Sequence, residues 1–231
     1  HLSDVNRKQV LIPPMFGNGH LVLTDLAIFN YKQTTEYNRE GQFTIMWDDP
    51  LYNIKWPVEI NAGLAFGTGH HGTTKGCLLE LDRLLEEGFF PKKVLDLGCG
   101  AGTLAIATAK ALKLNIIATD IDSDAVEVTL FNARINNVSK FIKCYKLDGV
   151  KNSKLQKNTF DLIFANILSG PLIKLSEGIV DILCPNGKVI LSGILDDQSE
   201  LVSRAFINCG LEIEKKSSIS GWTSITGRKI K

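Results

Sequence analysis

A glycine-rich turn that joins an apolar run to a helix-forming run carries the clearest chemistry in the sequence. Val94-Leu95-Asp96-Leu97 leads into glycines at three alternate positions, Gly98, Gly100 and Gly102. Glycine lets the backbone bend sharply, and it lets a ligand approach closely because it has no Cβ. The first N–H groups of the following helix have no partners within that helix and suit a polar or anionic group. The turn therefore predicts a nucleotide-type binding site.

Asp120 ends the next apolar run, about 20 residues after the turn, where βαβ nucleotide sites place a carboxylate that accepts the ribose hydroxyls. The alternative is a carboxylate that only caps the following helix. The dinucleotide fingerprint G-x-G-x-x-G is not met, because Thr103 occupies the place of its third glycine. The pattern present is G-x-G-x-G, preceded by Asp96. It resembles the first motif of class I S-adenosylmethionine-dependent methyltransferases, which implies S-adenosylmethionine as the cofactor.

Strand-like and helix-like segments alternate from residue 92 onward. Strands are predicted over 93–97, 115–120, 141–147, 160–166 and 188–194, and helices over 103–112, 124–136, 171–183 and 198–208. Such alternation predicts an α/β, Rossmann-like fold with a mostly parallel, doubly wound sheet, whose ligands bind at the carboxyl ends of the strands. Gly98, Asp120, Asp148 and Asn166 all fall at or just after such ends. This coincidence favours a binding site over four unrelated turns.

Three further segments carry a closer resemblance. They are residues 63–74, which read Gly-Leu-Ala-Phe-Gly-Thr-Gly-His-His-Gly-Thr-Thr, residues 164–168 around Asn166, and residues 184–195. Together with the turn, they resemble the ribosomal protein L-eleven methyltransferase family, which methylates amino groups on a large-subunit ribosomal protein. The resemblance implies an S-adenosylmethionine-dependent enzyme that N-methylates a protein amine. His70 departs from the family, which usually has Thr at that position.

The resemblance also assigns roles to individual residues. Thr74 and Asn166 match family positions beside the methionine end of the cofactor, and Asn166 also lies beside the incoming amine. Asp148 is expected to face the adenine amino group, although Asp148-Gly149 is also a favourable turn. We assign no catalytic base, because the sulfonium is already a good leaving group and transfer mainly requires proximity. We expect no metal ligands, and we expect cofactor contacts from Thr74, Asp96, Gly98, Gly100, Gly102, Asp120, Asp148 and Asn166.

The first 57 residues resemble a different family. Runs such as 10–23 and 43–50 follow the order and spacing of the second half of the cupin-fold dTDP-4-dehydrorhamnose 3,5-epimerases. The first half of that barrel, with its catalytic His, is absent, and Glu36 stands where the family has its catalytic Tyr. We therefore expect no epimerase activity. The sequence predicts a β-rich, incomplete cupin segment over 1–57 and a methyltransferase domain over 58–231.

An incomplete barrel leaves unpaired strand edges, and three outcomes remain open for residues 1–57. The segment pairs with a second copy in a homodimer, it packs on the methyltransferase domain, or the chain is a fragment or fusion product. Two further function classes also stay open. One is a methyltransferase of a nucleotide sugar or another small molecule, and the other is a non-catalytic cupin-derived binding or dimerisation module. The intact glycines and Asp120 argue against a decayed site.

Composition excludes several classes of protein. Of 231 residues, 44% are hydrophobic and 22% are charged, which is typical of a globular enzyme. No apolar run approaches the ~20 residues that span a bilayer, so we expect no membrane association. The net charge of +1 gives no direct indication of nucleic-acid binding. Five scattered Cys without a C-x-x-C pair indicate a reducing, cytoplasmic location.

The expected partner is a methyl acceptor. It is either a protein, ribosomal if the family resemblance holds, or a small molecule.

Overall fold

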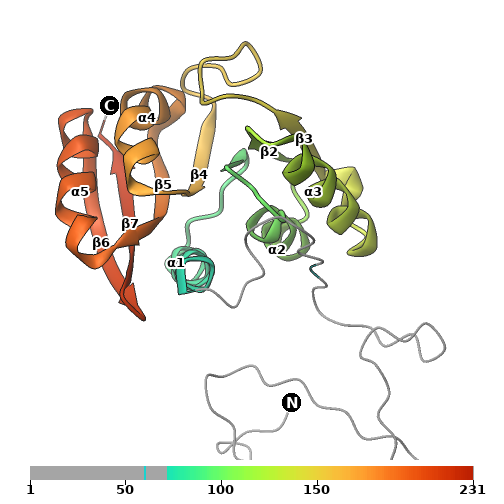
Figure 1. The fold of residues 1–231 in the computed structure, drawn as a ribbon, viewed down its shortest axis with the longest axis horizontal. Coiled ribbons are helices and arrows are strands. Elements are labelled where there is room, and N and C mark those ends of the chain that lie inside the picture. Colours follow the sequence, from blue (N-terminus) through green and yellow to red (C-terminus); the bar gives the residue numbers. More distant parts are fainter. Residues whose placement is uncertain (1–59, 61–71, 231) are drawn as a thin grey trace, which may run out of the picture. The chain divides into compact units, whose positions relative to one another are not determined.

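The computed structural model describes residue 60 and residues 72–230, which form a seven-stranded sheet with helices on both faces (Figure 1). The helices are α1 (Gly72–Glu86), α2 (Thr103–Leu112), α3 (Ser123–Ile135), α4 (Ser169–Ile182) and α5 (Ser199–Asn208), with short 3-10 turns η1 (Ser139–Phe141) and η2 (Asp196–Gln198). The strands are β1 (Val94–Leu97), β2 (Ile116–Asp120), β3 (Ile142–Lys146), β4 (Phe160–Asn166), β5 (Leu183–Leu195), β6 (Leu211–Ile219) and β7 (Trp222–Lys229). The predicted α/β fold is confirmed.

The strand order across the sheet is β3-β2-β1-β4-β5-β7-β6. Strand β1 lies between β2 and β4 and is parallel to both, with Leu95 opposite Ile117 on one side and Ile163 on the other. Among the described strands, β7 alone has the opposite direction to the rest of the sheet, and it pairs antiparallel with β5 and β6. The chain builds outward from β1 in one direction and then returns to its other side. This reversal between β1 and β4 is the switch point at which doubly wound sheets bind ligands.

Successive side chains on the central strands point to opposite faces of the sheet and pack into two separate cores. On β4, Leu162 and Phe164 belong to the core shared with α1, α2 and α3, whereas Ile163 and Ala165 belong to the core shared with α4 and α5. All four are fully buried. The two groups of helices cover opposite faces of the sheet (Figure 1). Strands buried on both faces carry continuous apolar runs, and this explains why the sequence predicted them well.

The sequence interpretation missed helix α1 and the last two strands, β6 and β7. The start of α1 is rich in Gly and Thr and gives little helical pattern. A Cβ on Gly76 would lie 2.2 Å from Ser224 Oγ, so the glycine allows α1 to approach β7 closely. The antiparallel β6–β7 pair completes the sheet.

The other elements lie close to their predicted places. The bounds of α2 and β4 match, while β5 begins at Leu183 rather than at residue 188. None of the helices in the described residues is long and apolar enough to cross a membrane. The predicted segment 1–57 and its boundary with 58–231 lie outside the described residues and stay predictions.

Candidate functional site

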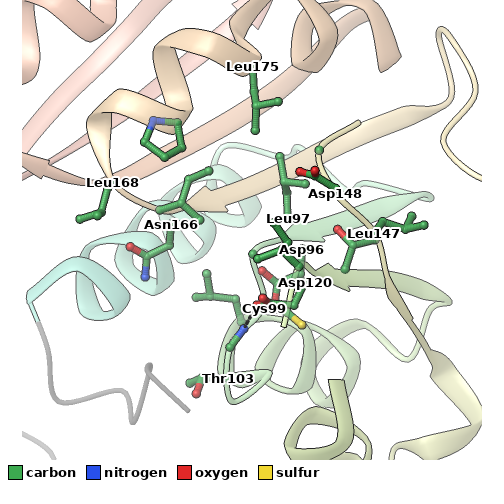
Figure 2. Close-up of a pocket in the computed structure, with 18 of the residues that line it drawn as sticks. Asp96, Leu97, Cys99, Thr103, Asp120, Leu147, Asp148, Asn166, Leu168 and Leu175 are labelled. Carbon is green, nitrogen blue, oxygen red and sulfur yellow. Dashed lines mark hydrogen bonds between the residues drawn. The ribbon is translucent and has the colours of Figure 1, made fainter. Parts of the chain in front are cut away.

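A cavity of about 560 Å³ opens at the carboxyl ends of the parallel strands (Figure 2). Its walls come from the turn after β1, the end of β2, the loop after β3, and the segment that joins β4 to α4. Cavities of this size hold small-molecule ligands and cofactors. Its position at the switch point is where the topology alone would place a ligand.

The structure brings the predicted site residues together at this cavity, with one difference. The lining includes Thr74, Asp96, Gly98, Gly100, Asp120, Asp148 and Asn166. Gly102 is not among the lining residues; it is the N-cap of α2, with φ +79°. A Cβ there would lie 2.8 Å from Thr129 Cγ2, so Gly102 sets the conformation of the turn and its packing on α3. The cofactor contact of each residue stays a prediction.

Backbone hydrogen bonds and close packing fix the glycine turn. The N–H groups of Gly98 and Cys99 both donate to the Thr119 carbonyl, at 2.8 and 3.0 Å. Gly98 has φ +73°, and a Cβ on it would lie 2.3 Å from Ile167 Cγ2. Glycine is therefore required at this position by both backbone conformation and space. The turn is held between the end of β2 and the loop after β4.

Asp120 presents a half-buried carboxylate at the end of β2. Its Oδ2 accepts from the Gly100 N–H at 2.9 Å, and its Oδ1 accepts from the Asp122 N–H at 3.0 Å. An ionised carboxylate offers about four acceptor positions, so about two remain for ligand hydroxyls. The N-cap of α3 is Asp122, whose side chain accepts from the Asp124 N–H at 2.9 Å. Asp120 is thus placed to serve the turn and the cavity rather than the helix start.

Asp96 lies under the turn and caps the helix that follows it. Asp96 is 1% exposed, and its Oδ2 accepts from the Ala105 N–H at 3.0 Å. Gly102, the N-cap, has no side chain for this task, so Asp96 satisfies an N–H of the first helical turn from the preceding strand. Burial is the main cause that raises the pKa of Asp96 to about 7; the hydrogen bond from Ala105 opposes this rise, and the nearby charge of Asp120 adds to it. Sequence reasoning did not anticipate this cap.

Asn166 and Thr74 meet across the cavity wall formed by β4 and α1. The Asn166 side-chain N–H donates to Thr74 Oγ1 at 3.4 Å, and Thr74 is 1% exposed. Asn166 Oδ1 is buried and has no hydrogen-bond partner among the described residues. A buried amide oxygen without a partner costs about 1–3 kcal/mol, which a ligand N–H can recover. Asn166 is therefore the candidate residue for an amine.

Asp148 is exposed and lies beside Leu147, whereas Asn166 and Leu168 lie on the other side of the cavity (Figure 2).

The remaining walls of the cavity are largely apolar. Leu168 is 67% exposed and forms part of the rim. Sequence reasoning missed the apolar lining, because Leu and Ile next to motif residues carry no pattern of their own. Among the described residues, no group of three or more His, Cys, Asp or Glu is placed to hold a metal ion.

The sheet order and the position of the cavity define a Rossmann-like class I methyltransferase fold. A crystal structure of ribosomal protein L11 methylase from Lactobacillus delbrueckii subsp. bulgaricus matches with a TM-score of 0.66 and 32% identity, covering 74% of this chain and 84% of that one. A [4+2]-cyclase shares the fold at a TM-score of 0.58 and 16% identity, covering 75% of this chain and 88% of that one. This second likeness shows the fold alone.

The sequence model of ribosomal protein L11 methyltransferase matches residues 37–230, and the chain belongs to that family. Relatives of that name from Bradyrhizobium diazoefficiens and Rhodopseudomonas palustris are 44% identical over 177 residues and 45% identical over 172 residues. The alignments cover 76% and 74% of this chain, and the chain spans only 60% and 58% of the relatives' length. A second model, dTDP-4-dehydrorhamnose 3,5-epimerase, matches residues 1–66. Both resemblances stated from the sequence are confirmed.

Proposed function

We propose that this protein is an S-adenosylmethionine-dependent methyltransferase that N-methylates an amine of ribosomal protein L11. The observation that carries the proposal is the buried Oδ1 of Asn166, which has no hydrogen-bond partner among the described residues. Asn166 lines the cavity together with the glycine turn and Asp120. A methyltransferase needs a cofactor cradle and an amine acceptor group within one cavity, and these residues supply both.

The residues present fit S-adenosylmethionine. Asp120 retains acceptor positions for the two ribose hydroxyls, and the turn has no side chains at Gly98 and Gly100 to block a close approach. Asp148 would face the adenine amino group, while Thr74 would lie near the methionine end. The cofactor supplies a methyl group on a sulfonium sulfur, which is released as a neutral thioether.

The protein's own contribution is orientation and exclusion of water. Asn166 accepts from the N–H of the incoming neutral amine and holds its lone pair toward the methyl carbon, while its own N–H group stays on Thr74. S-adenosylmethionine, held by the glycine turn and Asp120, would supply the methyl group and would keep the electron pair of the C–S bond that breaks. The amine then loses a proton to solvent. Apolar lining residues keep water from the reacting atoms, and proximity accounts for most of the rate.

A methylation assay tests this proposal directly. The purified chain is incubated with ribosomal protein L11 and S-adenosylmethionine labelled on the methyl group, and the labelled residue is located by mass spectrometry. Label on an L11 amine supports the proposal. Binding of S-adenosylmethionine without transfer to L11 would retain the cofactor assignment and overturn the substrate.

A second candidate acceptor is a nucleotide sugar, and the match of residues 1–66 to the epimerase family favours it. The same assay with a dTDP-sugar in place of L11 separates the two acceptors. We also propose that residues 1–57 pair two copies of the chain. Sedimentation of the full chain beside a chain that starts at Val58 tests this, since only the full chain should form a dimer while both bind cofactor equally.

A further inference from the structure

The carbonyl groups of the glycine turn are held by one face of α3. Thr129 Oγ1 donates to the Gly100 carbonyl at 2.9 Å, and Asn132 Nδ2 donates to the Ala101 carbonyl at 2.8 Å. Both side chains are fully buried. They are three residues apart on a helix and therefore lie on the same side of it. A single helix face thus holds two successive peptide groups of the turn.

These bonds fix the direction of the peptide N–H groups. A trans peptide unit has its C=O and N–H pointing in opposite directions, so a carbonyl held against α3 turns the next N–H away from α3. The neighbouring Gly100 N–H is held by Asp120 Oδ2 at 2.9 Å. The turn is therefore fixed from two sides, by Asp120 at its N–H and by Thr129 at its C=O. Glycine at both Gly100 and Gly102 would otherwise allow these peptides to rotate.

Neither α3 residue contacts the cavity. The lining includes Gly98, Cys99, Gly100 and Thr103, but neither Thr129 nor Asn132. Thr129 Oγ1 also lies 3.3 Å from the Sγ of Cys99, so the same hydroxyl contacts two consecutive residues of the turn. An effect of these side chains on ligand binding must therefore pass through the turn.

We propose that Thr129 and Asn132 are positioning residues, which hold the turn in the conformation that places Gly98, Cys99 and Gly100 along the wall of the cavity. This inference rests on the proposed binding of S-adenosylmethionine. The hydroxyl of Thr129 fixes the Gly100 peptide, and the amide of Asn132 fixes the Ala101 peptide. Loss of either bond lets the turn populate conformations that bind the cofactor poorly. The apparent affinity then falls in proportion to the fraction of molecules that keep the binding conformation.

The test compares three substitutions of buried threonines by calorimetric titration with S-adenosylmethionine. Thr129→Val keeps the shape and removes the hydroxyl, and Thr129→Ser keeps the hydroxyl. Thr108→Val is the matched control: its hydroxyl is fully buried and donates to the Leu104 carbonyl at 2.7 Å, but within α2. We expect Kd to rise about 3- to 10-fold in Thr129→Val, and to stay within about 2-fold of wild type in Thr129→Ser and Thr108→Val.

A second variant and a second measurement separate positioning from loss of stability. Asn132→Asp removes the amide donor to Ala101 and should weaken binding to a similar extent. Amide hydrogen exchange of Gly100 and Ala101 should be faster in Thr129→Val and unchanged in Thr108→Val. Wild-type affinity in both Thr129→Val and Asn132→Asp would overturn this inference alone. Failure of the wild-type protein to bind S-adenosylmethionine would overturn the proposed function and this inference with it.

Discussion

Replacement of Asp120 by Asn tests the cofactor site with the least change in shape. Both oxygens of the Asp120 carboxylate already accept a backbone N–H, from Gly100 at 2.9 Å and from Asp122 at 3.0 Å. The amide of Asn has one oxygen and one NH₂ group, and NH₂ can only donate. In either orientation, one of the two backbone donors loses its acceptor. One acceptor for the ribose hydroxyls and the negative charge are lost as well.

The size of the effect follows from the bonds that are lost. A hydrogen bond to a charged group contributes about 1.5–3 kcal/mol, which corresponds to a rise in Kd of about 10- to 150-fold. Isothermal titration of Asp120→Asn with S-adenosylmethionine measures it directly. The thermodynamic loss should appear at every salt concentration, because the group is half-buried and weakly screened.

Asp122→Asn provides the control, since it removes the same charge two residues away. Asp122 is exposed, does not belong to the cavity lining, and caps α3 through a bond that Asn also makes well. Its Kd should stay within about 2-fold of wild type. Equal affinity in wild type and Asp120→Asn, with both folded by circular dichroism, would refute the ribose role of Asp120.

Three further substitutions test other parts of the site. Asn166→Ala should lower kcat at saturating cofactor by more than tenfold, in line with ~1.5–3 kcal/mol, while Kd for S-adenosylmethionine changes little; normal kcat with weak binding would make Asn166 a cofactor residue only. The pKa of Asp96 is raised from 3.8 to about 7, so folding favours its protonated form. The stability of wild type should therefore fall relative to that of Asp96→Asn as pH rises from about 4 to about 7. The slope should be at most ~1.4 kcal/mol per pH unit. Urea denaturation across this range checks the sign, and parallel pH profiles would contradict it. Gly98→Ala should lower the melting temperature and the cofactor affinity together, because φ +73° and the 2.3 Å approach to Ile167 cost about 1–3 kcal/mol; an unchanged melting temperature would show that the turn adapts.

The sequence was sufficient for the central strands and for most of the site because both depend on local patterns. Continuous apolar runs mark strands that are buried on two faces, and β4 was placed at its observed bounds for this reason. Asp120 and Asn166 could be identified because parallel strands end at one edge of the sheet, so residues that close each run gather there.

The remainder depends on contacts between residues that are distant in sequence. Helix α1 begins at Gly72 with a segment of low helical propensity, and its packing on β7 stabilises it. Strand β6 lies at the sheet edge, and its residues Glu214, Lys215 and Lys216 are all exposed. Its sequence therefore lacks the regular alternation of apolar and polar residues that predicts a strand. The cap that Asp96 supplies to Ala105 joins a strand to a helix across the turn. No local pattern predicts such a bond.

The cavity at the switch point also has a consequence for the stability of the whole domain. Its walls include residues 96–100, 103–104, 119–121 and 147–149 from the half of the sheet that contains β1, β2 and β3, and residues 166–168, 171 and 174–175 after β4. A bound cofactor therefore joins two halves of the sheet that the chain builds separately, and neither half can unfold without releasing it. At a ligand concentration 100 times Kd, this linkage adds about 2.7 kcal/mol to the free energy of unfolding, or roughly 5–11 °C in melting temperature for a domain of this size. Under the proposed function, the protein's resistance to proteolysis in a cell would then follow the supply of S-adenosylmethionine.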